Sequence, residues 1–142
     1  LERPADVVRV EKADRTTIDV TGVGSQYIPE DPEKNTVGAV AEALDASLYN
    51  MRFVKPLDEA AVLEAAENHD LLVTLEEAAV PGGAGEAVNS CLMSHRVRVD
   101  VHNIGIPDRF VGHGSRGDEL RDAGLDAASL QTRIEALPAE GN

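Results

Sequence analysis

"LLVTLEEAAVPGGAGEAV", residues 71–88, carries the pattern that decides the fold class. Residues 71–75 predict a buried strand, which is expected to end at Glu76 and Glu77. The glycine-rich turn at residues 82–85 then opens a helix. The buried face of this helix is predicted to consist of four residues at helical spacing, Val88, Cys91, Leu92 and His95. A strand, a turn and a helix in this order form the unit from which parallel α/β sheets are built.

The chain on either side repeats this alternation. Strands are predicted at residues 7–10, 16–20, 48–54 and 97–102. The first two strands form a candidate hairpin around a charged turn at residues 11–15. A glycine turn at residues 21–25 and a proline-containing surface loop at residues 27–35 are predicted to follow.

Helices are predicted at residues 37–44 and 58–69, and in two segments that begin at Ser115 and Asp126. Asp58, Ser115 and Asp126 are the expected N-caps, and Asp118 completes a box-like motif with Ser115. The inner face of the last helix is predicted to contain Ala127, Leu130, Ile134 and Leu137. Together these elements predict one domain over residues 1–142, a three-layer α/β/α fold with a mostly parallel sheet of about five strands.

Composition and charge limit the functional classes. Thirteen basic and 26 acidic residues give a net charge of -13, which excludes nucleic acid as a partner because a phosphate backbone would be repelled. The single cysteine, Cys91, excludes an internal disulfide and favours a cytoplasmic location. No apolar run reaches membrane-spanning length, so no membrane partner is predicted. The chain begins at Leu1, and we expect it to be a domain excised from a longer polypeptide.

Local glycine motifs do not predict a nucleotide site. "GVG" (22–24) follows a strand, but Tyr27 stands where a dinucleotide-binding fingerprint needs its third glycine. The turn at residues 82–85 opens a helix, and a helix N-terminus attracts anions. Glu76 and Glu77 would repel a phosphate there, so we interpret this turn as a place of close backbone packing.

The histidines and the cysteine do not predict a metal site either. His69, His95, His102 and His113 are not spaced as H-x-H or H-x-x-x-H, and Cys91 has no second thiol. His113 lies in a glycine-rich loop, where it is either a structural residue or a catalytic acid–base group. The residues favour the structural interpretation, because a lone loop histidine has no local partner that would activate it.

A resemblance takes the interpretation further. Four segments resemble the C-terminal domain of the 1-deoxy-D-xylulose-5-phosphate synthase family, which belongs to the transketolase-like superfamily: "MRFVKPLD" (51–58), "LLVTLEEAAVPGGAGEAV" (71–88), "VHNIGIPDRFVGHGSR" (101–116) and "AGLD" (123–126). The similarity runs in order from Met51 to Leu137. It is weaker before Met51, where residues 27–35 replace the start of a long helix found in the family.

The resemblance implies a thiamine-diphosphate- and magnesium-dependent transferase that condenses pyruvate with glyceraldehyde 3-phosphate and releases CO2. The reaction serves isoprenoid, terpenoid and thiamine biosynthesis. Cofactor binding in the family needs a G-D-G motif, which this chain lacks. The resemblance therefore implies that two preceding domains hold the cofactor and the chemistry, that the intact enzyme is a homodimer, and that this chain alone is inactive and binds no cofactor or metal.

No catalytic residue is expected in this chain, but several residues are candidates for an interface or for the mouth of the active site. They follow the strands whose ends form the functional edge of an α/β sheet, and they are Glu76, Glu77, Asp108, Arg109 and His113. Phe110, inside the family's Asp-Arg-Phe…His-Gly signature, is predicted to be buried. Two alternatives stay open: a stand-alone, non-catalytic interaction domain, and the C-terminal domain of a 2-oxoacid dehydrogenase β subunit.

Overall fold

The structure is a computed structural model that describes residues 7–8, 18–23, 36–51, 53–110 and 112–137. The strands in these ranges are β1 (Val7–Val8), β2 (Ile18–Val23), β3 (Leu48–Asn50), β4 (Leu71–Ala79) and β5 (Asp100–Ile106). The helices are α1 (Thr36–Leu44), α2 (Glu59–Asn68), α3 (Ala84–Ser94), α4 (Arg116–Ala123) and α5 (Ala127–Glu135). The predicted turn at residues 11–15 and the loop at residues 27–35 lie outside the described residues.

The strands form one sheet in the order β1-β3-β2-β4-β5. β3, β2, β4 and β5 run parallel to one another, and β1 pairs antiparallel with β3 at the edge of the sheet. The predicted hairpin of the first two strands is therefore wrong: both edges of β2 are occupied by β3 and β4, so β1 pairs at the free edge of β3. The predicted α/β class is confirmed.

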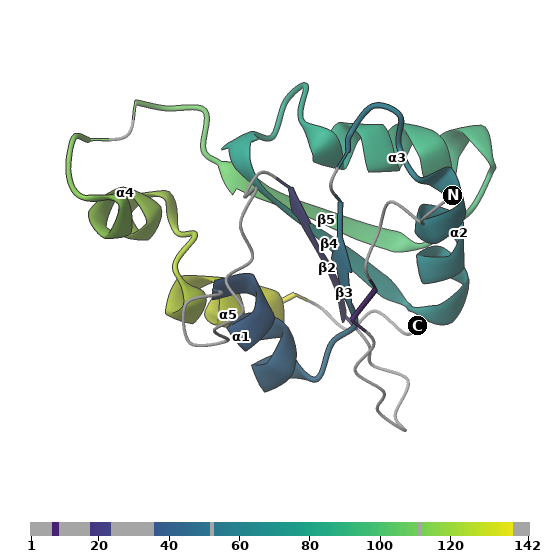
Figure 1. Cartoon of the computed structure of the whole chain (residues 1–142), viewed down its shortest axis with the longest axis horizontal. Coiled ribbons are helices and arrows are strands. Elements are labelled where there is room, and N and C mark those ends of the chain that lie inside the picture. The colour runs from purple at the N-terminus through teal and green to yellow at the C-terminus, as the bar shows by residue number, and fades with distance from the viewer. Residues whose placement is uncertain (1–6, 9–17, 24–35, 52, 111, 138–142) are drawn as a thin grey trace.

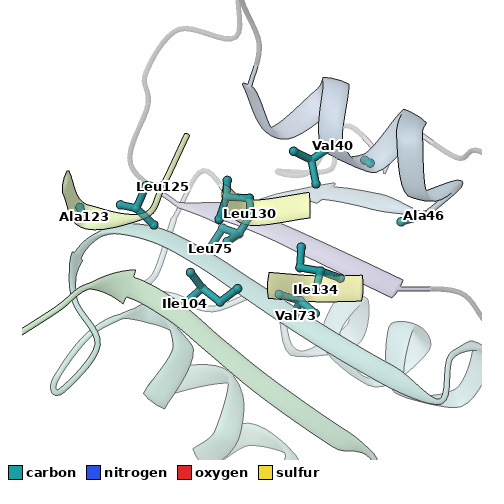
Figure 2. Close-up of a cluster of buried hydrophobic side chains, with 10 residues drawn as sticks. Val40, Ala46, Val73, Leu75, Ile104, Ala123, Leu125, Leu130 and Ile134 are labelled. Atoms are coloured by element: carbon teal, nitrogen blue, oxygen red, sulfur yellow. The ribbon is translucent and has the colours of Figure 1, made fainter. Parts of the chain in front are cut away.

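Helices cover both faces of the sheet, α1 and α5 on one face and α2 and α3 on the other (Figure 1). Figure 2 shows the first core, in which Val40 of α1 and Ile134 of α5 lie against Val73 of β4 and Ile104 of β5. The second core joins the opposite face to α2 and α3 through Val62, Leu72, Val88, Cys91 and Leu92. Because both of its faces are covered, β4 is buried from Leu72 to Glu76.

Several predicted boundaries shift. β2 continues through Gly22, which pairs with Asn50 and Leu75, so the glycine turn predicted at residues 21–25 is wrong over its first three residues. β3 ends at Asn50 rather than at residue 54. β5 begins at Asp100 and continues to Ile106. Each of these boundaries is set by the ladder with the neighbouring strand, which the composition of one segment does not reveal.

Two residues predicted on buried helix faces are exposed. His95 is the C-cap of α3, and its ring turns back to the carbonyl of Cys91. Ala127 is the first residue of α5, one position after its N-cap, and lies outside the helix–sheet contact. The helix interiors follow the prediction, because Val88, Leu130 and Ile134 are all buried.

All three predicted N-caps are confirmed, and the cap of α5 gives a pH-dependent test. Asp126 Oδ1 accepts a hydrogen bond from the backbone N–H of Ser129 at 3.1 Å, and Asp126 Oδ2 accepts one from the Ser129 hydroxyl. Hydrogen bonds from Ser129, first from its side chain and then from its backbone, hold the pKa of the Asp126 carboxyl below its ordinary value. The folded state therefore favours the ionised carboxylate, and this stabilisation is present at neutral pH and lost as the pH falls through the lowered pKa.

We expect Asp126→Ala to lower the free energy of unfolding by about 1 kcal/mol at neutral pH. Asp126→Asn keeps a good capping oxygen without a titrating carboxyl, so it is the matched control and should cost only a few tenths of a kcal/mol. Urea unfolding of the three proteins at neutral and acidic pH measures this. The difference between wild type and Asp126→Asn should disappear in acid, and a constant difference would contradict the role of the carboxylate.

Candidate functional site

The candidate site lies at the carboxyl ends of β4 and β5, where α3 begins. Glu76 and Glu77 belong to the last part of β4, and the loop after β5 carries Asp108, Arg109 and His113. The ladder between the two strands is regular up to Leu75 and shifts register before Ala79. Within this irregular stretch Glu76 is buried and Glu77 is exposed. The two adjacent glutamates therefore have different roles.

Glu76 completes the N-terminus of α3. Its side chain is 4% exposed, and Oε2 accepts a hydrogen bond from Ala84 N at 2.8 Å while Oε1 accepts one from Gly85 N at 3.3 Å. Gly83, the N-cap, has no side chain to do this. A helix N-terminus favours a negative charge, and here the protein's own carboxylate supplies it. The interpretation of this turn as a place of close packing is supported, since a Cβ atom at Gly83 would overlap the Glu76 carboxylate.

A polar pair, the buried Thr74 and the half-buried Asn103, lies beside this cap. Thr74 Oγ1 donates a hydrogen bond to Asn103 Oδ1 at 2.7 Å, joining residues that are paired in the β4–β5 ladder. A Cβ atom added to Gly85 would lie 2.7 Å from both Thr74 Oγ1 and Asn103 Oδ1. The first turn of α3 therefore packs directly on the ends of β4 and β5, and only glycine fits at position 85 without moving this pair.

Glu77 faces outward and joins β4 to α4. Arg116 Nη2 donates to Glu77 Oε1 at 2.6 Å and to Oε2 at 2.8 Å. The side chains of Glu77 and Arg116 are 35% and 68% exposed, so the pair contributes about 0–1 kcal/mol to folding. Its structural role is to fix where α4 begins. Arg116 was not a sequence candidate, and no spacing rule predicts a partner 39 residues away.

Arg109 folds the loop after β5 onto the end of α4. Its Nη1 donates to Asp122 Oδ2 at 3.2 Å, and its Nη2 donates to the Asp122 carbonyl at 2.6 Å. The hydrogen bond and positive charge of Arg109 hold the pKa of the Asp122 carboxyl below its ordinary value. Arg109 therefore pairs with Asp122, a residue that the sequence did not single out.

Residues 107–110 and 112–123, which we call the β5–α4 arm, extend away from the sheet (Figure 1). Asp108 and His113 are exposed, and neither side chain forms a hydrogen bond or ion pair with any residue that the structure describes. Phe110 is 102% exposed, so the prediction of a buried Phe110 is wrong. The arm has little core behind it, because Ala123 is the one buried residue of α4.

Among the described helices, none combines the length and the apolar character that a membrane span requires.

Comparison with known proteins gives the family. The model of the family "Transketolase, C-terminal domain" matches residues 36–130, which include β3 to β5 and the whole β5–α4 arm. The chain belongs to the transketolase C-terminal domain family. The mostly parallel sheet of the described residues, with helices on both faces, agrees with this membership.

Individual relatives of this transketolase C-terminal domain are synthases. The chain is 54% identical over 100 residues to 1-deoxy-D-xylulose-5-phosphate synthase of Salmonella paratyphi A, and 56% identical over 101 residues to that of Serratia proteamaculans. These matches cover 70% and 71% of this chain but only 16% of each relative. The chain is thus homologous to the C-terminal domain of this synthase and spans about a sixth of its relatives' length.

A solved structure supports the fold. The domain is similar to a structure described as "Split gene transketolase, inactive beta4 tetramer", with a TM-score of 0.74 and 23% sequence identity. The similarity covers 94% of this chain and 42% of that chain.

Proposed function

We propose that this chain serves as the C-terminal domain of a 1-deoxy-D-xylulose-5-phosphate synthase, which condenses pyruvate with glyceraldehyde 3-phosphate in isoprenoid precursor synthesis. The observation that carries the proposal is the 54–56% identity to synthases over about 100 residues. These residues make up 16% of the length of each relative. In this proposal the complete enzyme is a cytoplasmic homodimer, and thiamine diphosphate and Mg²⁺ bind in the two preceding domains.

The N-terminus of α3 does not fit a diphosphate group. The backbone N–H groups of Ala84 and Gly85, at the start of α3, already bind the Glu76 carboxylate. A phosphate brought to this helix would meet a buried negative charge instead of free donors. No step of the reaction is therefore assigned to this chain, and its proposed contribution is structural.

That contribution is an interface formed by the β5–α4 arm near the mouth of the active site. Phe110, Asp108 and His113 are exposed, so they are available to a neighbouring domain. The Arg109–Asp122 and Glu77–Arg116 contacts hold the arm in shape, while Glu76 fixes the turn beneath it. Aromatic residues and arginine are enriched at protein–protein interfaces. This supports an arm that packs on the preceding domains.

The proposal is tested with the full-length polypeptide that contains this chain. It should form 1-deoxy-D-xylulose 5-phosphate from pyruvate and glyceraldehyde 3-phosphate, and the activity should require thiamine diphosphate and Mg²⁺. If that polypeptide instead lacks this activity but binds another protein, the alternative of a stand-alone interaction domain replaces it. Dependence on a lipoyl or 2-oxoacid dehydrogenase partner would favour the third candidate.

We expect the 142-residue chain alone not to bind thiamine diphosphate with Mg²⁺, because its acidic strand ends and occupied helix N-terminus offer no anion site. Isothermal titration calorimetry measures this directly. Micromolar binding would mean that this chain contributes to the cofactor site, and the division of labour proposed above would be wrong.

In the intact enzyme, Arg109→Ala and His113→Ala should each lower kcat/KM by roughly ten- to a hundred-fold, if their contacts are felt in the transition state. Phe110→Ala should have an effect in the same direction while leaving the stability of this chain within about 0.5 kcal/mol of wild type, since the ring is exposed. Steady-state kinetics measure the first property, and thermal melts measure the second.

The control is Arg98→Ala, which removes an exposed arginine outside the arm and should change neither kcat/KM nor stability. Wild-type kinetics for all three arm variants would reduce the arm to a connection between β5 and α4.

A further inference from the structure

A cluster of three potential metal ligands lies on the opposite face of the sheet from α1 and α5. Glu59 is the first residue of α2, and Cys91 and His95 occupy positions i and i+4 at the end of α3. One ligand atom from each residue lies within 4.8 Å of the others. The two helices pack together in the second core, so the fold itself brings Glu59 to the other two.

The distances are close to those of a metal centre. His95 Nε2 lies 3.7 Å from Glu59 Oε2, and the three ligand atoms, one from each residue, lie within 4.8 Å of one another. Bonds of about 2.0–2.3 Å in a tetrahedral zinc site place neighbouring ligand atoms roughly 3.3–3.8 Å apart. The side chains of His95 and Glu59 are 40% and 60% exposed, which leaves them room to move the remaining distance.

The orientation of His95 is also suited to a metal. Its Nδ1 lies 2.9 Å from the carbonyl oxygen of Cys91. When Nδ1 carries the proton and donates to this carbonyl, Nε2 carries the lone pair and faces Glu59. A backbone carbonyl that fixes the second nitrogen is the usual outer-shell support of a metal-binding histidine.

We propose that Glu59, Cys91 and His95 form a binding site for a borderline-soft divalent cation of the zinc type, with its fourth position open to solvent. Thiolate, imidazole and carboxylate are the ligand classes that zinc accepts, whereas Mg²⁺ prefers oxygen ligands alone. Binding would join the start of α2 to the end of α3. The site is separate from the β5–α4 arm and does not rest on the function proposed above.

The charge state of Cys91 makes the binding dependent on pH. Burial, and secondarily the negative charge of Glu59, raise the pKa of the Cys91 thiol. The cation must therefore displace a proton from this thiol, and the measured affinity should rise with pH by up to about tenfold per unit. His95 and Glu59 are the other titratable groups at the cluster.

Cobalt(II) titration of the 142-residue chain tests the site, because Co²⁺ bound to a thiolate gives a charge-transfer band. Cys91 is the single cysteine of the sequence, so any such band reports on Cys91 alone. We expect the band in the wild-type protein, its loss on addition of Zn²⁺, and no effect of excess Mg²⁺. Cys91→Ser should abolish the band. His95→Gln and Glu59→Gln should weaken cobalt binding by at least about a hundredfold, more than the loss of an outer-shell partner.

The matched controls are the same two kinds of substitution, Glu to Gln and His to Gln, at residues outside the cluster. Glu86→Gln removes a glutamate from the first turn of α3, and His102→Gln removes a histidine from β5; both should bind cobalt like wild type. Because Glu59 and His95 are exposed, their variants keep the fold even if a change at the buried Cys91 does not. Absence of the band at saturating cobalt would overturn the proposal. An unchanged affinity in both His95→Gln and Glu59→Gln would do the same, since it would show a thiol that binds cobalt without them.

Discussion

Glu76→Ala is expected to lower the free energy of unfolding by about 3–6 kcal/mol, because each of the two backbone hydrogen bonds that the carboxylate accepts is worth about 1.5–3 kcal/mol. The loss leaves the N–H groups of Ala84 and Gly85 buried without a partner and removes a charge that the N-terminus of α3 favours. Urea unfolding followed by circular dichroism measures the change, since the chain has no tryptophan for fluorescence.

Two further variants show what causes the loss. Glu76→Gln keeps the volume and one acceptor oxygen, so its stability should fall between those of wild type and Glu76→Ala. Glu77→Ala removes the adjacent glutamate, whose pair with Arg116 is exposed, and should cost less than about 1 kcal/mol. Equal effects of Glu76→Ala and Glu77→Ala would show that Glu76 is not the cap of α3.

Gly85→Ala is expected to destabilise the protein by about 3 kcal/mol, the upper part of the range for overpacked sites. The new Cβ atom would lie 2.7 Å from Thr74 Oγ1 and from Asn103 Oδ1, and these two atoms are joined by a part-buried hydrogen bond. Either α3 must shift away from the sheet or the Thr74–Asn103 hydrogen bond must break. A lower melting temperature with reduced near-ultraviolet circular dichroism would report the first outcome.

Gly117→Ala is the matched control for this substitution. Gly117 is the second residue of α4, as Gly85 is of α3, but a Cβ atom there meets nothing closer than Ser115 Oγ at 3.9 Å. Alanine has the higher helix propensity, so Gly117→Ala should leave stability unchanged or raise it by up to about 1 kcal/mol. Destabilisation of both variants by the same amount would mean that the contacts at Gly85 are not the cause.

Features that depend on neighbouring residues could be predicted from the sequence. Asp58, Ser115 and Asp126 each precede a helix and cap it, because an N-cap acts on backbone groups two or three residues away. The α/β class also follows from local patterns, since strands and helices alternate along the chain. The resemblance to the synthase family, carried by segments such as residues 71–88, is confirmed by the transketolase C-terminal domain match over residues 36–130 and by the 54–56% identity to synthases.

Features that depend on distant residues could not be predicted in the same way. β1 pairs with β3 because both edges of β2 are taken, which no segment reveals alone. The sequence suggested that Glu76 would repel an anion at α3, and the structure shows how: Glu76 is itself the anion bound there. Phe110 was expected inside because it is aromatic, but burial requires a core behind the residue, and the β5–α4 arm extends away from the sheet.

The proposed packing of the β5–α4 arm on the preceding domains is tested most directly by hydrogen–deuterium exchange of the isolated chain beside the full-length enzyme. Amides of Leu72 to Leu75 in β4 belong to the buried sheet and should be protected in both proteins, which provides the internal control. If the β5–α4 arm packs on the preceding domains, the amides around Phe110 and His113 should exchange rapidly in the isolated chain and slowly in the intact enzyme. Equal, rapid exchange of these amides in both proteins would contradict the proposed interface.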